Sequence, residues 1–95
     1  MASQDRETMG KVAVTYRIMP EGVDIDLGAV SERVKEVIEG ADLARLDQKP
    51  IAFGLKFLEV ILVMDDANNS SSEHEDKFTG ISGVQSVEIT DVNLL

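Results

Sequence analysis

Residues 49–55, Lys-Pro-Ile-Ala-Phe-Gly-Leu, join two strand-like runs near the middle of the chain and decide how its two halves fold together. Pro50 fixes its own φ and restricts the residue before it, whereas Gly54 permits a sharp backbone path. Phe53, one of only four aromatic residues, lies between them. This arrangement favours a presented aromatic side chain. The alternative is an ordinary turn whose Phe folds back into the core.

The first half of the chain has the pattern of a strand followed by a helix. Residues 11–19 alternate between apolar and other side chains, which is typical of a half-buried strand. Asp26 has the chemistry of a helix N-cap. The helix expected after it has an apolar face formed by Leu27, Val30, Val34, Val37 and Ile38. Its polar face consists of Ser31, Glu32, Lys35 and Glu36.

Residues 43–52 form a weaker second strand, which completes the first half as strand–helix–strand. The second half repeats this pattern and begins with residues 55–64, which are almost continuously apolar, as in an inner strand. Residues 65–72 are polar and indicate a loop. A short helix follows, with Phe78 and Ile81 as its inward anchors.

The last strand spans residues 84–95, and Val92 falls out of its alternation, which indicates a bulge or a change of face. Two strand–helix–strand units in succession predict an α+β fold, the ferredoxin-like βαββαβ sandwich. Its four-stranded antiparallel sheet would carry two helices on one face and leave the other face open. We expect residues 1–8 to be a disordered extension and residues 9–95 a single domain.

Composition narrows the function. The 95 residues include no Cys, no run long enough to span a bilayer and no signal-peptide core, so we expect a cytoplasmic protein without membrane contact. The net charge is −9, and no cluster of Lys and Arg is present. Direct binding to nucleic acid is therefore disfavoured. The preferred interpretation of the negative charge is that it keeps the protein soluble. The second interpretation is that it attracts a basic protein partner.

Residues with catalytic or metal-binding chemistry are few. His74 is the only histidine, and a half-buried structural role is favoured over catalysis. The Asp65-Asp66 stretch resembles the start of a calcium loop but lacks the glycine at the sixth position and the glutamate at the twelfth. We therefore expect no cofactor, no metal and no covalent chemistry. A binding module remains, with an RNA-binding module and a small-molecule regulatory domain as alternatives.

Several short motifs, taken in their order and spacing, resemble one family over residues 9–95. The motifs are Met9-Gly10, Arg17-Ile18-Met19-Pro20, Val23-Asp24-Ile25-Asp26-Leu27, Pro50-Ile51-Ala52-Phe53-Gly54-Leu55, Gly80-Ile81-Ser82-Gly83-Val84 and Val87-Glu88-Ile89-Thr90-Asp91-Val92. The chain is similar in these motifs to the elongation factor 1-beta family in its short archaeal form. The resemblance implies a ferredoxin-like fold, in agreement with the pattern of elements.

The same resemblance implies a guanine nucleotide exchange factor that binds elongation factor 1-alpha and speeds the release of GDP, with no chemistry of its own. We expect the chain alone to be a monomer. An aromatic residue after the second strand contacts the partner in related factors, and Phe53 matches it. A lysine next to their C-terminus enters the partner's magnesium site, but Leu94 stands there in this chain. The implied partner-binding residues are Pro50, Ile51, Ala52, Phe53, Gly54, Asn93, Leu94 and Leu95.

Overall fold

The computed structural model describes residues 10–38, 40–65 and 71–94. The elements run in the order β1 (Lys11–Pro20), α2 (Leu27–Val37), β2 (Ala41–Ala52), β3 (Leu55–Asp65), α3 (Ser71–Thr79) and β4 (Val84–Leu94). This order confirms the predicted βαββαβ sequence of elements. The second strand begins two residues earlier than expected. The expected extension at residues 1–8 and most of the expected loop at residues 65–72 lie outside the described residues.

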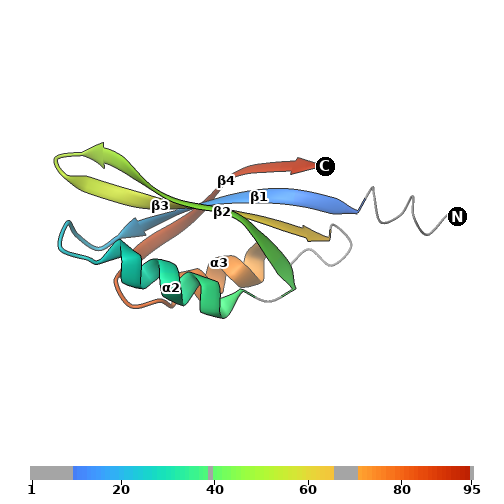
Figure 1. Ribbon diagram of the computed structural model, residues 1–95, viewed down its shortest axis with the longest axis horizontal. Helices are drawn as coiled ribbons and strands as arrows, with labels where there is room; N and C mark the ends of the chain where they lie inside the picture. The colour runs from blue at the N-terminus through green and yellow to red at the C-terminus, as the bar shows by residue number, and fades with distance from the viewer. Residues whose placement is uncertain (1–9, 39, 66–70, 95) are drawn as a thin grey trace, which may run out of the picture.

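The four strands form one sheet in the order β2-β3-β1-β4, and every neighbouring pair is antiparallel. Both helices cover the same face of the sheet, which confirms the ferredoxin-like fold (Figure 1). The β2–β3 hairpin projects from one end of the sheet, and β4 ends at the opposite end (Figure 1). The hairpin and the end of β4 therefore lie at opposite ends of one continuous sheet (Figure 1).

The central strands β1 and β3 alternate between a buried face and a half-buried face. In β1 the prediction is confirmed, because Val12, Val14, Tyr16 and Ile18 are all buried. β3 is central as predicted, yet its burial alternates despite its nearly continuous apolar sequence. Its buried residues are Leu58, Val60, Leu62 and Met64. The helices shield only one side of the sheet, so the alternate apolar residues of β3 face the open side.

Helix α2 begins where the sequence predicts. The Asp26 Oδ1 atom accepts hydrogen bonds from the backbone N–H groups of Gly28, at 2.9 Å, and Ala29, at 3.3 Å. These are two of the donors that the first helical turn cannot satisfy itself. Ser31 was predicted to lie on the polar face of α2, but it is buried, so this prediction is wrong. Its hydroxyl donates to the Leu27 carbonyl at 2.8 Å, which satisfies the polar group inside the core.

Helix α3 is anchored to the sheet by an aromatic pair. The Tyr16 and Phe78 rings meet edge to face with their centroids 5.2 Å apart, and both residues are fully buried. Burial, and secondarily the Glu75 carboxylate, raise the pKa of Tyr16 to about 12. His74 is only 1% exposed, so the expected half-burial of this residue is wrong. His74 lies one helical turn before Phe78 on the same face of α3, so both side chains are buried in the core.

A bulge in β4 confirms the change of phase predicted at Val92. Thr15 pairs with Asp91 but Tyr16 pairs with Ile89, so one extra β4 residue lies between the two pairs. After the bulge, Val92 pairs with the buried residue Val14. The extra residue therefore turns the end of β4 so that Val92 lies on the helix-covered side of the sheet. Val92 is nevertheless 54% exposed.

Candidate functional site

The β2–β3 hairpin closes through a two-residue turn. Ala52 pairs with Leu55, and the two residues between them, Phe53 and Gly54, have φ values of 53° and 79°. Positive φ at both central positions is the geometry of a type I′ turn, whose twist matches that of the flanking strands. Such turns usually contain Asn-Gly or Gly-Gly. Here the first position holds an aromatic residue.

Phe53 is held in an unfavourable backbone conformation and is completely exposed. Its side chain is 100% accessible to solvent. For a residue with a Cβ atom, the left-handed region costs about 1–2 kcal/mol, and no burial of the ring offsets this cost. The structure therefore shows an exposed Phe53 and excludes a Phe that folds back into the core. Strain of this kind is typical of functional sites.

The approach to the turn is also irregular. Pro50 lies in β2, an edge strand of the sheet, where a missing N–H is tolerated. A register shift between Pro50 and Ala52 leaves Ile51 as an extra residue, and its side chain is 41% exposed. Below this point the Lys49 Nζ atom lies 2.9 Å from the Glu59 Oε1 atom and joins β2 to β3. The hairpin tip thus presents two apolar side chains on a regularly paired base.

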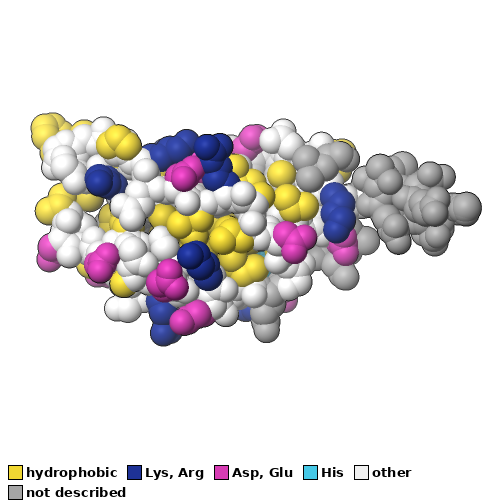
Figure 2. Space-filling view, in the orientation of Figure 1, with side chains coloured by type: hydrophobic (Ala, Val, Ile, Leu, Met, Phe, Trp, Pro, Cys, Tyr) yellow, Lys and Arg dark blue, Asp and Glu magenta, His cyan; other side chains and the backbone are white. Residues whose placement is uncertain are grey.

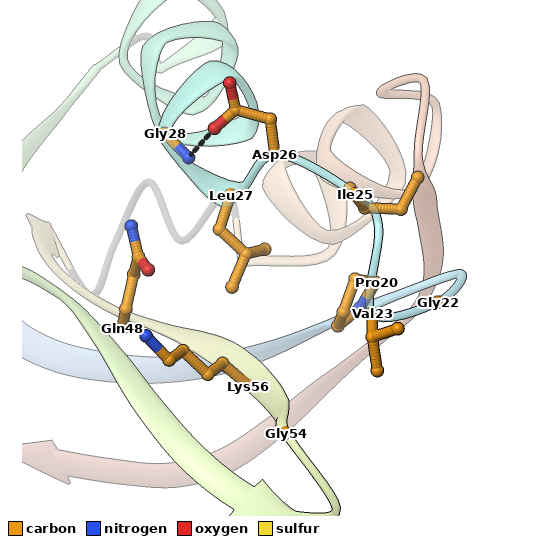
Figure 3. Close-up of a pocket in the computed structure, with 10 residues that line it drawn as sticks. All are labelled: Pro20, Gly22, Val23, Ile25, Asp26, Leu27, Gly28, Gln48, Gly54 and Lys56. Carbon is orange, nitrogen blue, oxygen red and sulfur yellow. Dashed lines mark hydrogen bonds between the residues drawn. The ribbon is translucent and has the colours of Figure 1, made fainter.

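A pocket of about 310 Å³ lies beside the hairpin. Its walls come from the β1–α2 loop, the start of α2, and the hairpin strands, as Figure 3 shows. Val23 and Lys56 line this pocket together with Gly54, and Val23 is 68% exposed. Hydrophobic side chains are visible at this end of the molecule in Figure 2. Neither Val23 nor Lys56 could be assigned to the site from the sequence, because only the tertiary fold brings the β1–α2 loop to the hairpin.

The second group of predicted site residues lies at the other end of the sheet. Leu94 pairs with Val12, which in turn pairs with Met64 near the end of β3. A strand advances ~3.3 Å per residue, so the turn after Ala52 and the end of β4 are roughly 30 Å apart. Leu94 is 72% exposed. The structure thus brings residues 50–54 together and separates them from Leu94, while Leu95 lies outside the described residues.

Asn93 is adjacent to Leu94 but faces the opposite side of the sheet. It pairs with Ala13, and its Nδ2 atom donates to the Asp91 Oδ2 atom at 2.8 Å. This local hydrogen bond holds the amide over the open face. The predicted site residues at this end therefore offer one apolar and one polar side chain in opposite directions.

The open face of the sheet carries a feature that the sequence analysis missed. The Arg17 guanidinium carbon lies 5.1 Å from the centre of the Phe57 ring, and its Nε atom is buried without a hydrogen-bond partner. Phe57 belongs to β3, whose nearly continuous apolar sequence does not indicate which side chains face outward. In the register, Glu59 and Glu88 lie on either side of Arg17. Arg17 thus covers the Phe57 ring and is itself flanked by two acidic residues.

Among residues 10–38, 40–65 and 71–94, no group of three or more His, Asp or Glu side chains could hold a metal ion. No helix within the same ranges is long and apolar enough to cross a membrane.

A sheet with one open face is combined here with a hairpin that exposes an aromatic side chain. This combination is typical of a protein-binding domain. The chain belongs to the family described as "EF-1 guanine nucleotide exchange domain", whose profile matches residues 13–95. This membership confirms the predicted class of protein, a guanine nucleotide exchange factor of translation elongation.

Curated archaeal relatives agree with the family assignment. Elongation factor 1-beta of Methanothermobacter thermautotrophicus is 43% identical over 88 residues, which cover 92% of this chain and 99% of the relative. Elongation factor 1-beta of Methanosarcina barkeri is 46% identical over 86 residues, with 88% and 97% covered. The protein of the same name from Archaeoglobus fulgidus is 40% identical over 88 residues, with 92% and 100% covered. The similarity thus extends over nearly the whole of each relative.

Proposed function

We propose that this chain binds elongation factor 1-alpha through the β2–β3 hairpin and accelerates the release of GDP from it. The observation that carries the proposal is the fully exposed Phe53 ring, held at a positive φ in a chain of the exchange-factor family. A solvent-exposed aromatic ring contributes nothing to the core, and aromatic residues are enriched among interface anchors. Phe53 therefore has the properties of an anchor.

The proposed exchange follows from differential binding. A factor that binds the nucleotide-free conformation of its partner more tightly than the GDP-bound conformation lowers the affinity for GDP. The coupling is reciprocal, so GDP lowers the affinity for the factor by the same ratio. GTP then binds the nucleotide-free partner, and the same reciprocal coupling releases the factor. This cycle makes and breaks no covalent bond on the factor, so the proposed role is not that of an enzyme.

We place the partner interface at both ends of the sheet. The first contact comprises Pro50, Ile51, Ala52, Phe53 and Gly54, and the second comprises Asn93, Leu94 and Leu95. The hydrogen-bonded sheet fixes the separation of the two contacts at roughly 30 Å. A partner must then adopt a conformation whose two complementary surfaces match this separation. A fixed separation between contacts is thus a simple means of selecting one conformation of a GTPase.

The chain end differs from the pattern that the resemblance implies. A leucine has no charge with which to compete with magnesium, so we assign Leu94 a supporting apolar contact. Displacement of the partner's nucleotide-binding elements would then come mainly from the hairpin contact. We further propose that the factor acts in the cytoplasm as a monomer, without direct contact to nucleic acid or membrane.

Neither alternative function is favoured by a specific observation. An RNA-binding sheet of this topology presents exposed aromatic rings beside basic side chains. Here the open face offers Phe57, which is covered by the Arg17 guanidinium, and Arg17 is itself flanked by Glu59 and Glu88. The pocket beside the hairpin is open to solvent and is lined by the exposed apolar side chain of Val23, which suits a protein surface better than a small molecule.

The proposal is tested by measuring affinity for two states of one partner. Purified archaeal elongation factor 1-alpha, nucleotide-free and GDP-bound, is titrated with this protein in a calorimeter. We expect the nucleotide-free form to bind at least about tenfold more tightly, which corresponds to ~1.4 kcal/mol of coupling. Equal affinities for the two forms would remove the basis for exchange.

A further inference from the structure

Lys56 has an unusual environment for a cation in this acidic chain. Three other lysines lie within ion-pair distance of a carboxylate: Lys11 of Asp65, Lys35 of Glu32 and Lys49 of Glu59. Lys56 is exposed and has no ion-pair partner among residues 10–38, 40–65 and 71–94. It lies two residues after Gly54 and pairs with Pro50. The chain carries a net charge of −9, so an uncompensated ammonium group at the hairpin is a local exception.

The register determines where this ammonium group points. Alternate residues of β3 from Leu58 onward are buried under the helices, and Lys56 is in phase with them. α2 begins at Leu27, so Lys56 lines the pocket there instead of the core. Figure 3 shows its side chain reaching below Leu27 toward Gln48. The amine is thus directed into a recess that is open to solvent.

Val23 lines the same recess from the β1–α2 loop. Its side chain is 68% exposed although it is a β-branched apolar residue. Of the exposed large apolar side chains, Val23 lines this pocket, whereas Ile51 and Phe53 lie outside it on the hairpin whose Gly54 forms part of its wall. An apolar surface with a charge at its margin is the usual composition of a protein-binding site.

We infer that Val23 and Lys56 extend the Phe53 contact into one composite surface. On this surface the Lys56 ammonium group binds an acidic side chain of the partner GTPase. The inference rests on the proposed function and goes beyond it by assigning a second segment and the charge of the group that it binds. The absence of a carboxylate beside Lys56 within the described part of the chain leaves its ammonium group available to that acidic group. The pairing supplies specificity and a faster, salt-sensitive association.

The test compares single variants in titrations of nucleotide-free elongation factor 1-alpha at several salt concentrations. Lys56→Glu is expected to weaken binding on the order of tenfold or more at low salt. Lys56→Gln is expected to flatten the salt dependence of the affinity. Val23→Ala removes two buried methyl groups from the interface and is expected to weaken binding on the order of tenfold. The matched control is Lys35→Glu on the outer face of α2, with affinity and salt dependence unchanged.

The outcomes separate this inference from the proposed function. If the unaltered protein binds the partner while the Lys56 and Val23 variants behave like Lys35→Glu, the composite surface is wrong and the exchange function stands. If the unaltered protein does not bind, the proposed function fails and the inference fails with it. Because Val23 and Lys56 are exposed, denaturation of each variant should match that of the unaltered protein. A variant that fails this control is set aside, and the other carries the test.

Discussion

Phe53 and Leu94 project from opposite ends of the same sheet, separated by the length of β3. Both side chains are apolar and exposed, at 100% and 72%. Neither contributes substantially to the core, and no loop brings the two together. The sheet between them acts as a spacer of roughly 30 Å, which we propose sets the distance between two contacts on the partner.

Replacing Phe53 with asparagine separates folding from function. Asn tolerates the left-handed conformation that the turn requires, so Phe53→Asn should raise the free energy of unfolding by about 0.5–1 kcal/mol. The same change removes an interface anchor and should weaken partner binding by ~2 kcal/mol or more, about 30-fold. Chemical denaturation and titration of the partner measure the two effects. A destabilised variant that binds normally would show that Phe53 serves the fold.

Two alanine variants provide a matched comparison of the same residue type. Phe78 is completely buried, so Phe78→Ala should cost about 3–5 kcal/mol of unfolding free energy, a large share of the stability of a small domain. Phe53→Ala should change it by less than about 0.5 kcal/mol. Equal destabilisation by the two substitutions in urea denaturation would contradict the assigned environments.

Some features of the fold could be predicted from local sequence patterns alone. The alternation of β1 and the cap at Asp26 were predicted correctly, because local periodicity and capping chemistry determine them. The exposure of Phe53 followed from its proline and glycine neighbours. Its positive φ did not, since the usual signature of this turn places Asn or Gly there.

Other features depend on tertiary structure. Ser31 was assigned to the polar face of α2 from its side-chain type, but a hydroxyl that bonds back to the helix carbonyl can be buried. Val23 and Lys56 are far apart in sequence, and only the packing of α2 against the sheet brings their segments to one pocket. The separation of Leu94 from the hairpin likewise requires the strand order and register.

The single tyrosine predicts a pH dependence of stability. The pKa of Tyr16 is about 12 in the folded protein and about 10 in an unfolded chain. The contribution of this residue is therefore complete below pH 10 and is lost as the pH rises from 10 to 12, by roughly 2–3 kcal/mol. Unfolding curves of the unaltered protein and Tyr16→Phe over this range isolate the effect from other titrating groups. Tyrosinate absorbance of the folded protein with a midpoint near pH 10 would contradict the burial of Tyr16.

The chain end should matter for binding more than for folding. Because Leu94 is largely exposed, truncation after Asn93 should lower the unfolding free energy by less than about 1 kcal/mol. We expect the truncation to weaken partner binding, with little change in how the exchange rate depends on magnesium. Leu94→Lys is the companion variant, assayed across the same magnesium titration. Loss of exchange with unchanged partner affinity would instead make the chain end the displacing element.

Deletion of residues 1–8 should leave both stability and exchange unchanged within error. The segment is polar, and it precedes both the start of β1 at Lys11 and the part of the chain that matches the family. Urea denaturation and nucleotide release of the shortened and full-length chains provide the comparison. A clear loss of either property would show that these residues contribute to the fold or to the partner interface.

Release of fluorescent GDP tests the central claim most directly. Archaeal elongation factor 1-alpha preloaded with the labelled nucleotide is mixed with excess unlabelled GTP and increasing amounts of this protein, and the decay is followed in a stopped-flow instrument. We predict a release rate that rises with protein concentration and saturates, and a much smaller rise with Phe53→Ala at the same concentrations. A rate that stays at its spontaneous value at saturating protein would contradict the account.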